Sequence, residues 1–262
     1  MLTRDLEQLV QHRELLVAWI TRELKARYKQ TALGIVWAVV QPLSLMLIFT
    51  LVFGIFVRIP IQDGLPYPLF SYAGLLAWTF TATSLSLGVT SLTRNMHVLT
   101  TVYFPREILP IASVAASLAD FALASMVFVG LLIAYHIAIS PYVLLIPVIL
   151  LVQVLLTLGI TLWASAINVF WRDARFVVPL ALQIWFYASP IVYPTHLVPQ
   201  ALYPFYILNP MVGIVEGYRA TVLGATPPDW NTLGIAALVA IVVFVSGYAY
   251  FKHVETQFAD MV

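Results

Sequence analysis

The stretch VLLIPVILLVQVLLTLGITLWASAI, residues 143–167, is apolar on every face of the helix that it would form. Crossing the hydrocarbon core of a bilayer takes about 20 apolar residues, because a helix rises ~1.5 Å per residue through ~30 Å of lipid. Backbone N–H and C=O groups in lipid must form their hydrogen bonds within the protein, and a helix forms these bonds internally. Strands of a membrane barrel would instead show short segments of alternating hydrophobicity. This stretch therefore predicts a transmembrane helix in an all-α integral membrane protein.

The whole chain shares this apolar character. Of its 262 residues, 61% are hydrophobic and 10% are charged, whereas soluble domains average about 25% charged residues. The sequence predicts a cytoplasmic N-terminal segment, residues 1–32, followed by one transmembrane domain, residues 33–255. Within that domain we expect six transmembrane helices, at residues 33–57, 68–91, 107–136, 142–170, 176–193 and 231–251.

The positive charges are distributed unevenly between the segments that connect these spans. Lys and Arg concentrate in the short loops on the cytoplasmic side of a membrane protein. Most of the basic residues here precede the first span or lie in the second and fourth connections, among them Arg22, Lys25, Arg94, Arg172 and Arg175. Arg58 and Arg219 remain on the other side. This pattern predicts that both termini are cytoplasmic and that the region of Arg219 is at the outer face.

The N-terminal stretch RELLVAWITRELKARYKQ, residues 13–30, predicts an amphipathic helix at the membrane interface. Arg22 and Lys25 lie on one flank, and apolar side chains recur on another at four-residue spacing, at Leu16, Ile20, Leu24 and Tyr28. Two interpretations stay open. The helix is a surface anchor held by anionic lipids, or it is also a docking surface for a cytoplasmic partner.

The second connection, TRNMHVLTTVYFPREILP at residues 93–110, carries more apolar residues than a turn needs. A short helix lying across the cytoplasmic surface would use them, and a partner could press on it. The contact residues would then be Arg94, Met96, Val98 and Tyr103. The alternative is an ordinary loop before a capped helix start, since Pro105 suits the first turn of the next helix.

The fourth connection, WRDARFVVP at residues 171–179, places Arg172, Asp173 and Arg175 in one tight bend. Cytoplasmic anchoring explains the two arginines. Asp173 between them favours a local salt bridge or a hydrogen-bonded bend.

Aromatic residues gather in the first and fifth spans. They are either belts at the membrane interface or rings on which sugars stack, because the apolar faces of sugar rings pack on aromatic side chains. For a polar polymer that crosses in a water-filled path, the candidate lining residues are Trp37, Phe49, Phe53, Trp185, Phe186 and Tyr187.

The stretch ILNPMVGIVEGYRATVLG, residues 207–224, is apolar but too short to cross a bilayer, and it contains Glu216 and Arg219. Prolines interrupt the chain before it, so we expect it to bend back after the fifth span.

Asn209 can cap a helix whose first residue is Pro210. Glu216 and Arg219 then share a face. An unpaired charge in mid-membrane costs about 2.5–3.5 kcal/mol, so the two should pair or touch water. The alternative is an interfacial hairpin with a surface ion pair.

Asp120 is an ionisable residue well inside the third span. Intramembrane acids are candidates for function, and secondary transporters use them for ion coupling. Ser117 and small neighbours favour a hydrogen bond in helix packing instead. The other spans hold no acidic or basic partner, which disfavours ion coupling.

Motifs of catalysis are absent from the sequence. There is no G-x-x-x-x-G-K-[ST] phosphate loop, no H-E-x-x-H pair and no cysteine, and the five histidines are scattered. We therefore expect no catalytic residue and no metal site. If ATP drives this protein, a separate subunit must hydrolyse it.

Four stretches, in order along nearly the whole chain, resemble the permease subunits of ABC-2-type exporters for O-antigen, capsule and teichoic acid polysaccharides. They are RELKARYKQTALGIVWAVVQPL, VYFPREILP, RDARFVVPLALQIWFYASPIVYP and LNPMVGIVEGYR. The resemblance implies a homodimer of permeases in the bacterial cytoplasmic (inner) membrane, with two cytoplasmic ATPase subunits that bind ATP and Mg. It also implies a channel for an undecaprenyl-linked glycan and no nucleic acid partner.

The same resemblance implies that residues 194–225 form a re-entrant hairpin that gates the outer end of the channel, with Asn209, Glu216 and Arg219 as gate residues. It places the contacts with the ATPase on the N-terminal helix and the second connection, at Arg22, Lys25, Arg94, Met96, Val98 and Tyr103. Other functions stay open: an ABC-2 permease for a lipid or drug, an ion-coupled secondary transporter and, least favoured, an intramembrane enzyme.

Overall fold

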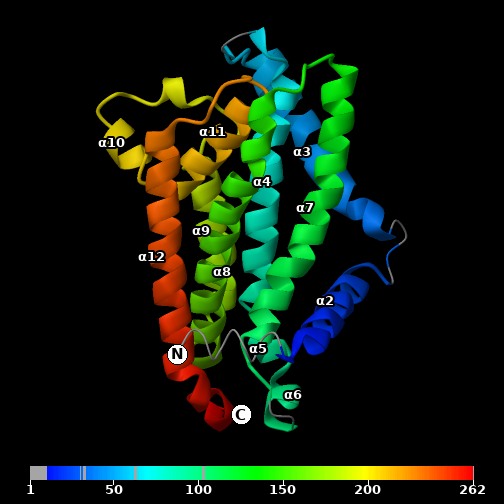
Figure 1. Ribbon diagram of the computed structural model, residues 1–262, viewed down its shortest axis with the longest axis vertical. Helices are drawn as coiled ribbons and strands as arrows, with labels where there is room; N and C mark the ends of the chain where they lie inside the picture. The colour runs from blue at the N-terminus through cyan, green and yellow to red at the C-terminus, as the bar shows by residue number, and fades with distance from the viewer. Residues whose placement is uncertain (1–10, 30, 32–33, 62–63, 102–103, 262) are drawn as a thin grey trace.

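The protein is a bundle of helices that lie side by side along its long axis (Figure 1). The computed structural model describes residues 11–29, 31, 34–61, 64–101 and 104–261, and this part of the chain contains no strand. The prediction of an all-α fold is therefore confirmed. The helices are α2 (Arg13–Tyr28), α3 (Trp37–Phe49), α4 (Tyr67–Gly88), α5 (Ser91–Arg94), α6 (Met96–Thr101), α7 (Ile108–Ala134), α8 (Ile146–Phe170), α9 (Ala174–Tyr187), α10 (Tyr203–Tyr206), α11 (Pro210–Val222) and α12 (Trp230–Val254).

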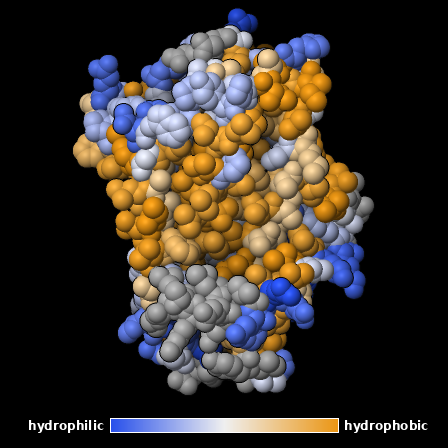
Figure 2. Space-filling model, viewed as in Figure 1, coloured by the Kyte–Doolittle hydropathy of each residue, from blue (hydrophilic) through white to orange (hydrophobic). Residues whose placement is uncertain are grey.

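Four helical stretches are long and apolar enough to cross a bilayer: Gly34–Phe56, Ile108–Ala134, Pro141–Phe170 and Trp230–Phe258. They coincide with four of the six expected spans. In the first, α3 continues into a π-helical turn at Thr50–Phe56. Figure 2 shows the matching hydrophobic band across the middle of the molecule, with polar residues gathered toward the ends. The chain is a multi-pass membrane protein.

The expected second span corresponds to α4, which is 22 residues long but is not among the four strongly apolar stretches. This helix lies inside the bundle, in contact with α3, α7, α8, α9 and α11. Because protein rather than lipid surrounds it, polar residues such as Ser71, Thr81 and Ser84 are accommodated in its buried faces. A hydropathy test on the sequence underestimates a helix that is enclosed in this way.

The helix at the expected fifth span is shorter than the sequence predicted. This helix, α9, has 14 residues and ends at Tyr187 instead of residue 193. At ~1.5 Å per residue this helix is about 21 Å long, less than a ~30 Å hydrocarbon core. The Ser189 hydroxyl donates to the carbonyl of Trp185. Pro190 then lacks the N–H that would continue the helix. Beyond it the chain turns irregularly through α10 to α11.

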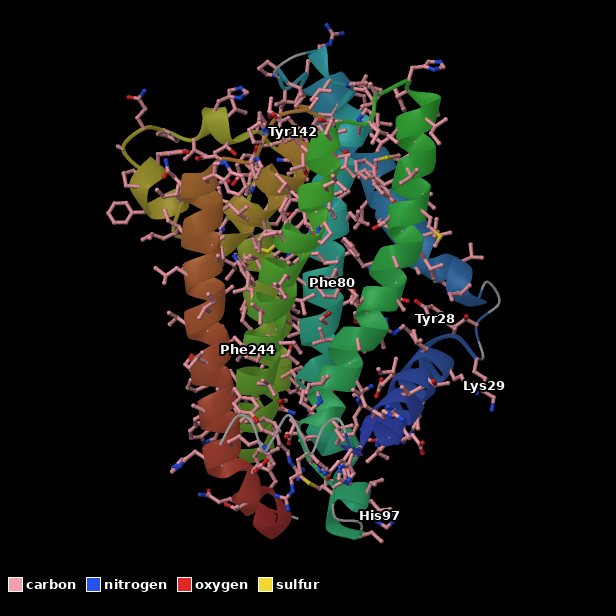
Figure 3. The ribbon with its side chains drawn as sticks, viewed as in Figure 1. Tyr28, Lys29, Phe80, His97, Tyr142 and Phe244 are labelled. Carbon is pink, nitrogen blue, oxygen red and sulfur yellow. The ribbon has the colours of Figure 1, made fainter. Side chains whose placement is uncertain are left out.

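The N-terminal helix α2 packs against α7 through polar contacts with Asp120. Arg27 forms an ion pair with the Asp120 carboxylate, and the Tyr28 hydroxyl donates to it at 2.7 Å. Figure 3 shows Tyr28 where the end of α2 meets α7. Burial and the bond to Asp120 raise the pKa of Tyr28 to about 12, so the hydroxyl keeps its proton at neutral pH.

Asp120 therefore serves helix packing, as expected, but with a basic partner that the sequence analysis did not name. Ser117 participates by accepting from Arg27 at 3.5 Å. This partner was not expected because Arg27 belongs to the helix that precedes the first span and not to another span.

Helices α8 and α12 approach each other so closely that only glycine fits at their contact. A Cβ atom on Gly159 would lie 2.6 Å from the Cα of Phe244, and one on Gly247 would lie 2.4 Å from the carbonyl oxygen of Gly159. Figure 3 labels Phe244 on this side of α12. Small residues at helix contacts are typical of membrane proteins, where close packing replaces the hydrophobic effect between helices.

We expect Gly159→Ala to lower the free energy of unfolding by about 1–3 kcal/mol, because the added methyl group forces the two backbones apart. The matched control is Gly130→Ala in α7, where a Cβ would meet nothing within 4 Å and where Ala favours the helix by up to ~1 kcal/mol. Reversible unfolding in mixed detergent micelles measures both. Equal stability of the two variants would contradict the close contact.

Candidate transport pathway and gate

The region after α9 is organised around the guanidinium of Arg219, whose side chain is 6% exposed. Its Nε donates to the carbonyl of Phe70 in α4 at 3.2 Å, and its two terminal nitrogens donate to the carbonyls of Pro190 and Ile191 at 2.5 and 2.8 Å. The guanidinium also lies 3.5 Å from the centre of the Phe70 ring, a favourable cation–π distance. One side chain of α11 thus joins α4 to the segment that follows α9.

The carbonyls of Pro190 and Ile191 explain why a cation is buried here. They lie beyond the end of α9, so no N–H of a continuing helix reaches them. A buried carbonyl without a hydrogen bond costs about 1–3 kcal/mol, and an arginine offers five N–H donors in a planar fork. Arg219 therefore supplies the hydrogen bonds that a continuing helix would have given to these two carbonyls.

Glu216 pairs with Arg219, as the sequence predicted, with 3.0 Å between Oε1 and the guanidinium. The Thr195 hydroxyl donates to the same carboxylate oxygen at 2.8 Å. The Glu216 side chain is 35% exposed, so it balances the buried charge of Arg219 from the edge of the protein.

A glycine in α4 makes room for this arrangement. A Cβ atom on Gly74 would lie 2.7 Å from the carbonyl oxygen of Ile191 and 2.8 Å from a terminal nitrogen of Arg219. Any larger residue at position 74 would displace the guanidinium from its carbonyl partners. Gly74, Phe70 and Thr195 were not predicted as site residues, because nothing near them in the sequence marks them as partners of Arg219.

Asn209 caps α11 by accepting from the N–H of Met211 at 3.1 Å, as predicted, and Pro210 is the first residue of the helix. The same side chain binds the end of α9. Its Oδ1 accepts from the indole of Trp185 at 2.8 Å, and its Nδ2 donates to the Ala188 carbonyl at 3.0 Å and the Ser189 hydroxyl at 2.9 Å. Asn209 and Arg219 thus fix both ends of the contact between α11 and the end of α9.

Five of the six candidate lining residues gather in one aromatic cluster. The rings of Phe49 and Phe53 lie 5.9 Å apart, Phe49 stacks on Phe186 at 5.8 Å, and Phe186 meets Tyr187 at 5.2 Å. Trp78 of α4, which the sequence analysis missed, connects Trp185 to Phe186 at 5.7 and 5.6 Å.

Trp37 lies apart from this cluster. It begins α3, twelve residues before Phe49, which places it about 18 Å away along the helix axis. It is 46% exposed and lines a hollow with Arg27 and Asp120. The structure therefore does not bring Trp37 together with the other five residues.

A buried polar network in the middle of the bundle also escaped the sequence analysis. The Gln153 amide of α8 donates to the Ala77 carbonyl and the Thr81 hydroxyl of α4 at 2.6 and 3.0 Å. Its oxygen accepts from the hydroxyl of Tyr218 in α11 at 3.0 Å. Sequence inspection could have found it, because Gln153 is the one glutamine in the apolar stretch at residues 143–167.

Comparison with known proteins now decides the family. Residues 14–223 match the ABC-2 type transporter family. The O-antigen export system permease protein RfbA of Myxococcus xanthus is 33% identical over 267 residues, which cover 99% of both chains. The chain belongs to the ABC-2 type transporter family. A permease of the same printed name from Klebsiella pneumoniae is 28% identical over 95% of both chains, and the polysialic acid transport protein KpsM of Escherichia coli is 23% identical over 90% of this chain and 91% of its own.

In this ABC-2 family member, the helices α2, α5 and α6, which carry the expected ATPase contacts other than Tyr103, lie in the half of the bundle opposite α11 (Figure 1). Arg22 and Lys25 are exposed on α2, and Arg22 lies over the Trp19 ring at 4.3 Å. Arg94 ends α5 and reaches Glu23 of α2 at 3.8 Å. Met96 and Val98 in α6 are half-buried against the apolar cluster that includes Trp19. Tyr103 lies outside the described residues.

In the part of the ABC-2 chain that the structure describes, no three His, Asp or Glu side chains come together in a group that could hold a metal ion. The expectation that this chain carries no metal site stays a prediction.

Because Arg219 binds three backbone carbonyls and Glu216 binds none, replacing the two residues should have unequal effects. We expect Arg219→Ala to lower stability by about 3–5 kcal/mol, since it leaves buried carbonyls and a carboxylate without partners. Glu216→Gln should cost about 1–2 kcal/mol, because the amide oxygen still accepts from Thr195 and Arg219.

Unfolding of purified variants in mixed micelles measures both effects. The exchanged double variant Glu216→Arg with Arg219→Glu is the matched control for charge. It should remain as unstable as Arg219→Ala, since an arginine at position 216 starts nearly a turn away from the carbonyls. Recovery of wild-type stability in the exchanged variant would mean that only the ion pair matters.

Proposed function

We propose that this protein is the permease subunit of an ATP-driven exporter that moves undecaprenyl-linked cell-surface polysaccharide across the bacterial cytoplasmic membrane. The observation that carries the proposal is the 33% identity to an O-antigen export permease over 99% of both chains. Because the alignment covers nearly the whole relative, it includes the segments through which the relative exports its substrate.

The topology that we propose has six spans, with α4 and α9 as the second and fifth, and both termini cytoplasmic. In this arrangement α11 is the inner arm of a re-entrant hairpin, residues 194–225, at the outer face. Two observations support it. Arg22, Lys25, Arg94 and Arg172 occupy one end of the bundle, as the positive-inside rule requires. The neighbours of α11 in the chain, α10 before it and the start of α12 after it, lie at the same end of the bundle (Figure 1).

Two copies of this chain would form the channel, with two ATPase subunits on the cytoplasmic side. The exposure of α9 in the single chain supports the packing of a second copy along this helix. Only Leu182 of α9 is buried, whereas Phe176, Leu180 and Ile184 are 59–65% exposed. Between the copies, the aromatic cluster of Phe49, Phe53, Trp185, Phe186 and Tyr187 offers ring faces on which sugars stack and slide.

ATP and Mg would bind to the partner subunit, because this sequence has no phosphate loop. The force of hydrolysis would enter through α2, α5 and α6. The ion pair between Arg27 and Asp120 supports this path, since it fixes α2 to the middle of α7.

We expect Tyr187→Ala to reduce polysaccharide export about two- to tenfold, the loss that corresponds to one aromatic contact of about 0.5–1.5 kcal/mol. Tyr187 is 60% exposed in the single chain, so the loss does not reflect a damaged core. Trp230→Ala is the matched control, because Trp230 is equally exposed but lies at the start of α12. The permease is reconstituted with its ATPase, and ATP-dependent entry of lipid-linked polysaccharide into inverted vesicles is measured. The proposal fails if the wild-type complex exports none.

A further inference from the structure

An apolar hollow of about 150 Å³ lies between α7 and α11. Its other walls are α4 and residues 139–146, which include the 3₁₀ turn η4 (Pro141–Leu145). Figure 3 labels Tyr142 of this turn at the end of the bundle that contains α11. The hollow is therefore in the same half of the protein as the contacts of Arg219.

The hollow runs along one stripe of α7. The residues of α7 that line it are Phe121, Ser125, Phe128, Val129 and Leu132, which follow the spacing of one helix face. From the first to the last they cover about 16 Å along the helix axis. They begin near the middle of α7, which is 27 residues long. The hollow thus extends through about half of a ~30 Å hydrocarbon core.

Water is a poor occupant of this hollow, because the walls offer few free polar groups. Among the described residues that line it, Ser125 and Tyr218 carry the polar side chains. The Ser125 hydroxyl donates to the Phe121 carbonyl at 2.7 Å, and the Tyr218 hydroxyl donates to Oε1 of Gln153 at 3.0 Å. A buried water makes about three hydrogen bonds to polar groups. The hollow therefore favours an apolar occupant.

The hollow borders the lipid at two of its lining residues, Val129 and Ile139, which are 47% and 68% exposed. We call this pair the mouth of the hollow. Val129 belongs to a helical stretch that is apolar and long enough to cross a bilayer, so hydrocarbon chains lie against the mouth. Protein interiors contain few voids larger than a water molecule. An apolar cavity of this size takes a molecule such as benzene, with about six carbons.

The wall opposite the mouth is part of α11. Tyr218 and Val222 line the hollow from this helix and are only 6% and 7% exposed. An occupant of the hollow therefore packs against the last turns of α11. Tyr218 directly precedes Arg219, whose guanidinium binds the carbonyls beyond α9. The hollow thus connects the surrounding lipid with the helix that carries Arg219.

We propose that an unbranched acyl chain of a membrane phospholipid inserts a segment of about six carbons into this hollow and stabilises α11 in its position against α4 and α8. Without the chain, Tyr218 and Val222 face an empty space and lose van der Waals contacts. The chains of the bilayer would in this way influence how firmly α11 is held. This inference is independent of the molecule that the protein exports.

The probe for binding is a phosphatidylcholine with a photoreactive diazirine in one acyl chain. The full-length permease is reconstituted in nanodiscs that contain a small share of this lipid and is then irradiated, and the crosslinked residues are identified by mass spectrometry. We expect crosslinks at Tyr218 or Val222, which are buried from the bulk lipid. Crosslinks are also expected at Leu238 of α12, which is 64% exposed and reports on the bulk lipid.

Two variants fill the hollow from different sides. Ser125→Leu adds carbon atoms inside it, and Val129→Trp adds an indole at its mouth. Each should lower the crosslinks in α11 about tenfold or more, because each CH₂ group that is displaced favours binding about fourfold. Crosslinks at Leu238 should stay unchanged, which also shows that the variants are inserted. Val245→Trp is the matched control, since Val245 is 56% exposed on α12, and it should leave the crosslinks in α11 at the wild-type level.

Hydrogen exchange of the backbone amides measures the effect on α11. Diphytanoyl-phosphatidylcholine has methyl branches along its chains, so a chain segment of equal length needs more room than an unbranched one. In nanodiscs of this lipid, the last two turns of α11 should exchange about threefold or more faster than in unbranched lipid. Ser125→Leu should show a smaller difference, because its own side chain fills part of the hollow. Exchange in α12 around Leu238 should be the same in both lipids.

Three results would overturn the inference: crosslinks at Leu238 with none in α11, crosslinks in α11 that both filling variants leave unchanged, or equal exchange of α11 in the two lipids. None of these experiments measures export. Their failure therefore contradicts the acyl-chain site alone and leaves the proposed function as it stands.

Discussion

The half of this protein that contains α11 depends on how the backbone groups beyond α9 find hydrogen-bond partners in a nonpolar medium. The helix α9 ends at Tyr187, and the carbonyls of Pro190 and Ile191 beyond it are without helical N–H partners. In lipid, each such group costs several kcal/mol unless the protein satisfies it. Arg219 supplies the donors, and its own charge is balanced by Glu216. The break in α9 and the buried arginine of α11 therefore depend on each other.

Several other features follow from this contact. Gly74 is required in α4 because the guanidinium and the Ile191 carbonyl occupy the space of a side chain. Asn209 binds α9 from the opposite end of the contact, and Tyr218, the residue before Arg219, joins α11 to Gln153 of α8. With these contacts, α11 is joined to α4, α8 and the end of α9. A movement of α9 must carry α11 with it or break several hydrogen bonds in a nonpolar environment.

The sequence was sufficient for the features that depend on local chemistry. Uniform hydrophobicity at residues 143–167 predicted the fold class, Asn209 and Pro210 predicted the start of α11, and the spacing of Glu216 and Arg219 predicted their pairing. Partners that are distant in sequence were not accessible in this way. Periodicity shows which face of a helix is apolar but not which helix covers it, so Trp78, Gly74 and the bond from Arg27 to Asp120 required the structure. The end of α9 was misjudged because its apolar residues continue past the last helical hydrogen bond.

The central claim is that the hairpin at residues 194–225 enters the membrane and returns to the same face. The chain has no cysteine, so single cysteines can be placed on either side of α11 without a change of background. Leu208→Cys and Thr226→Cys flank the helix at exposed positions, and His97→Cys in α6 marks the opposite end of the bundle. Reaction with a membrane-impermeant maleimide is measured in intact cells and after permeabilisation. The account predicts that both flanking cysteines react in intact cells and that the cysteine at position 97 reacts only after permeabilisation. Reaction of the two flanking cysteines from opposite sides would show that α11 crosses the membrane, and it would contradict the re-entrant gate.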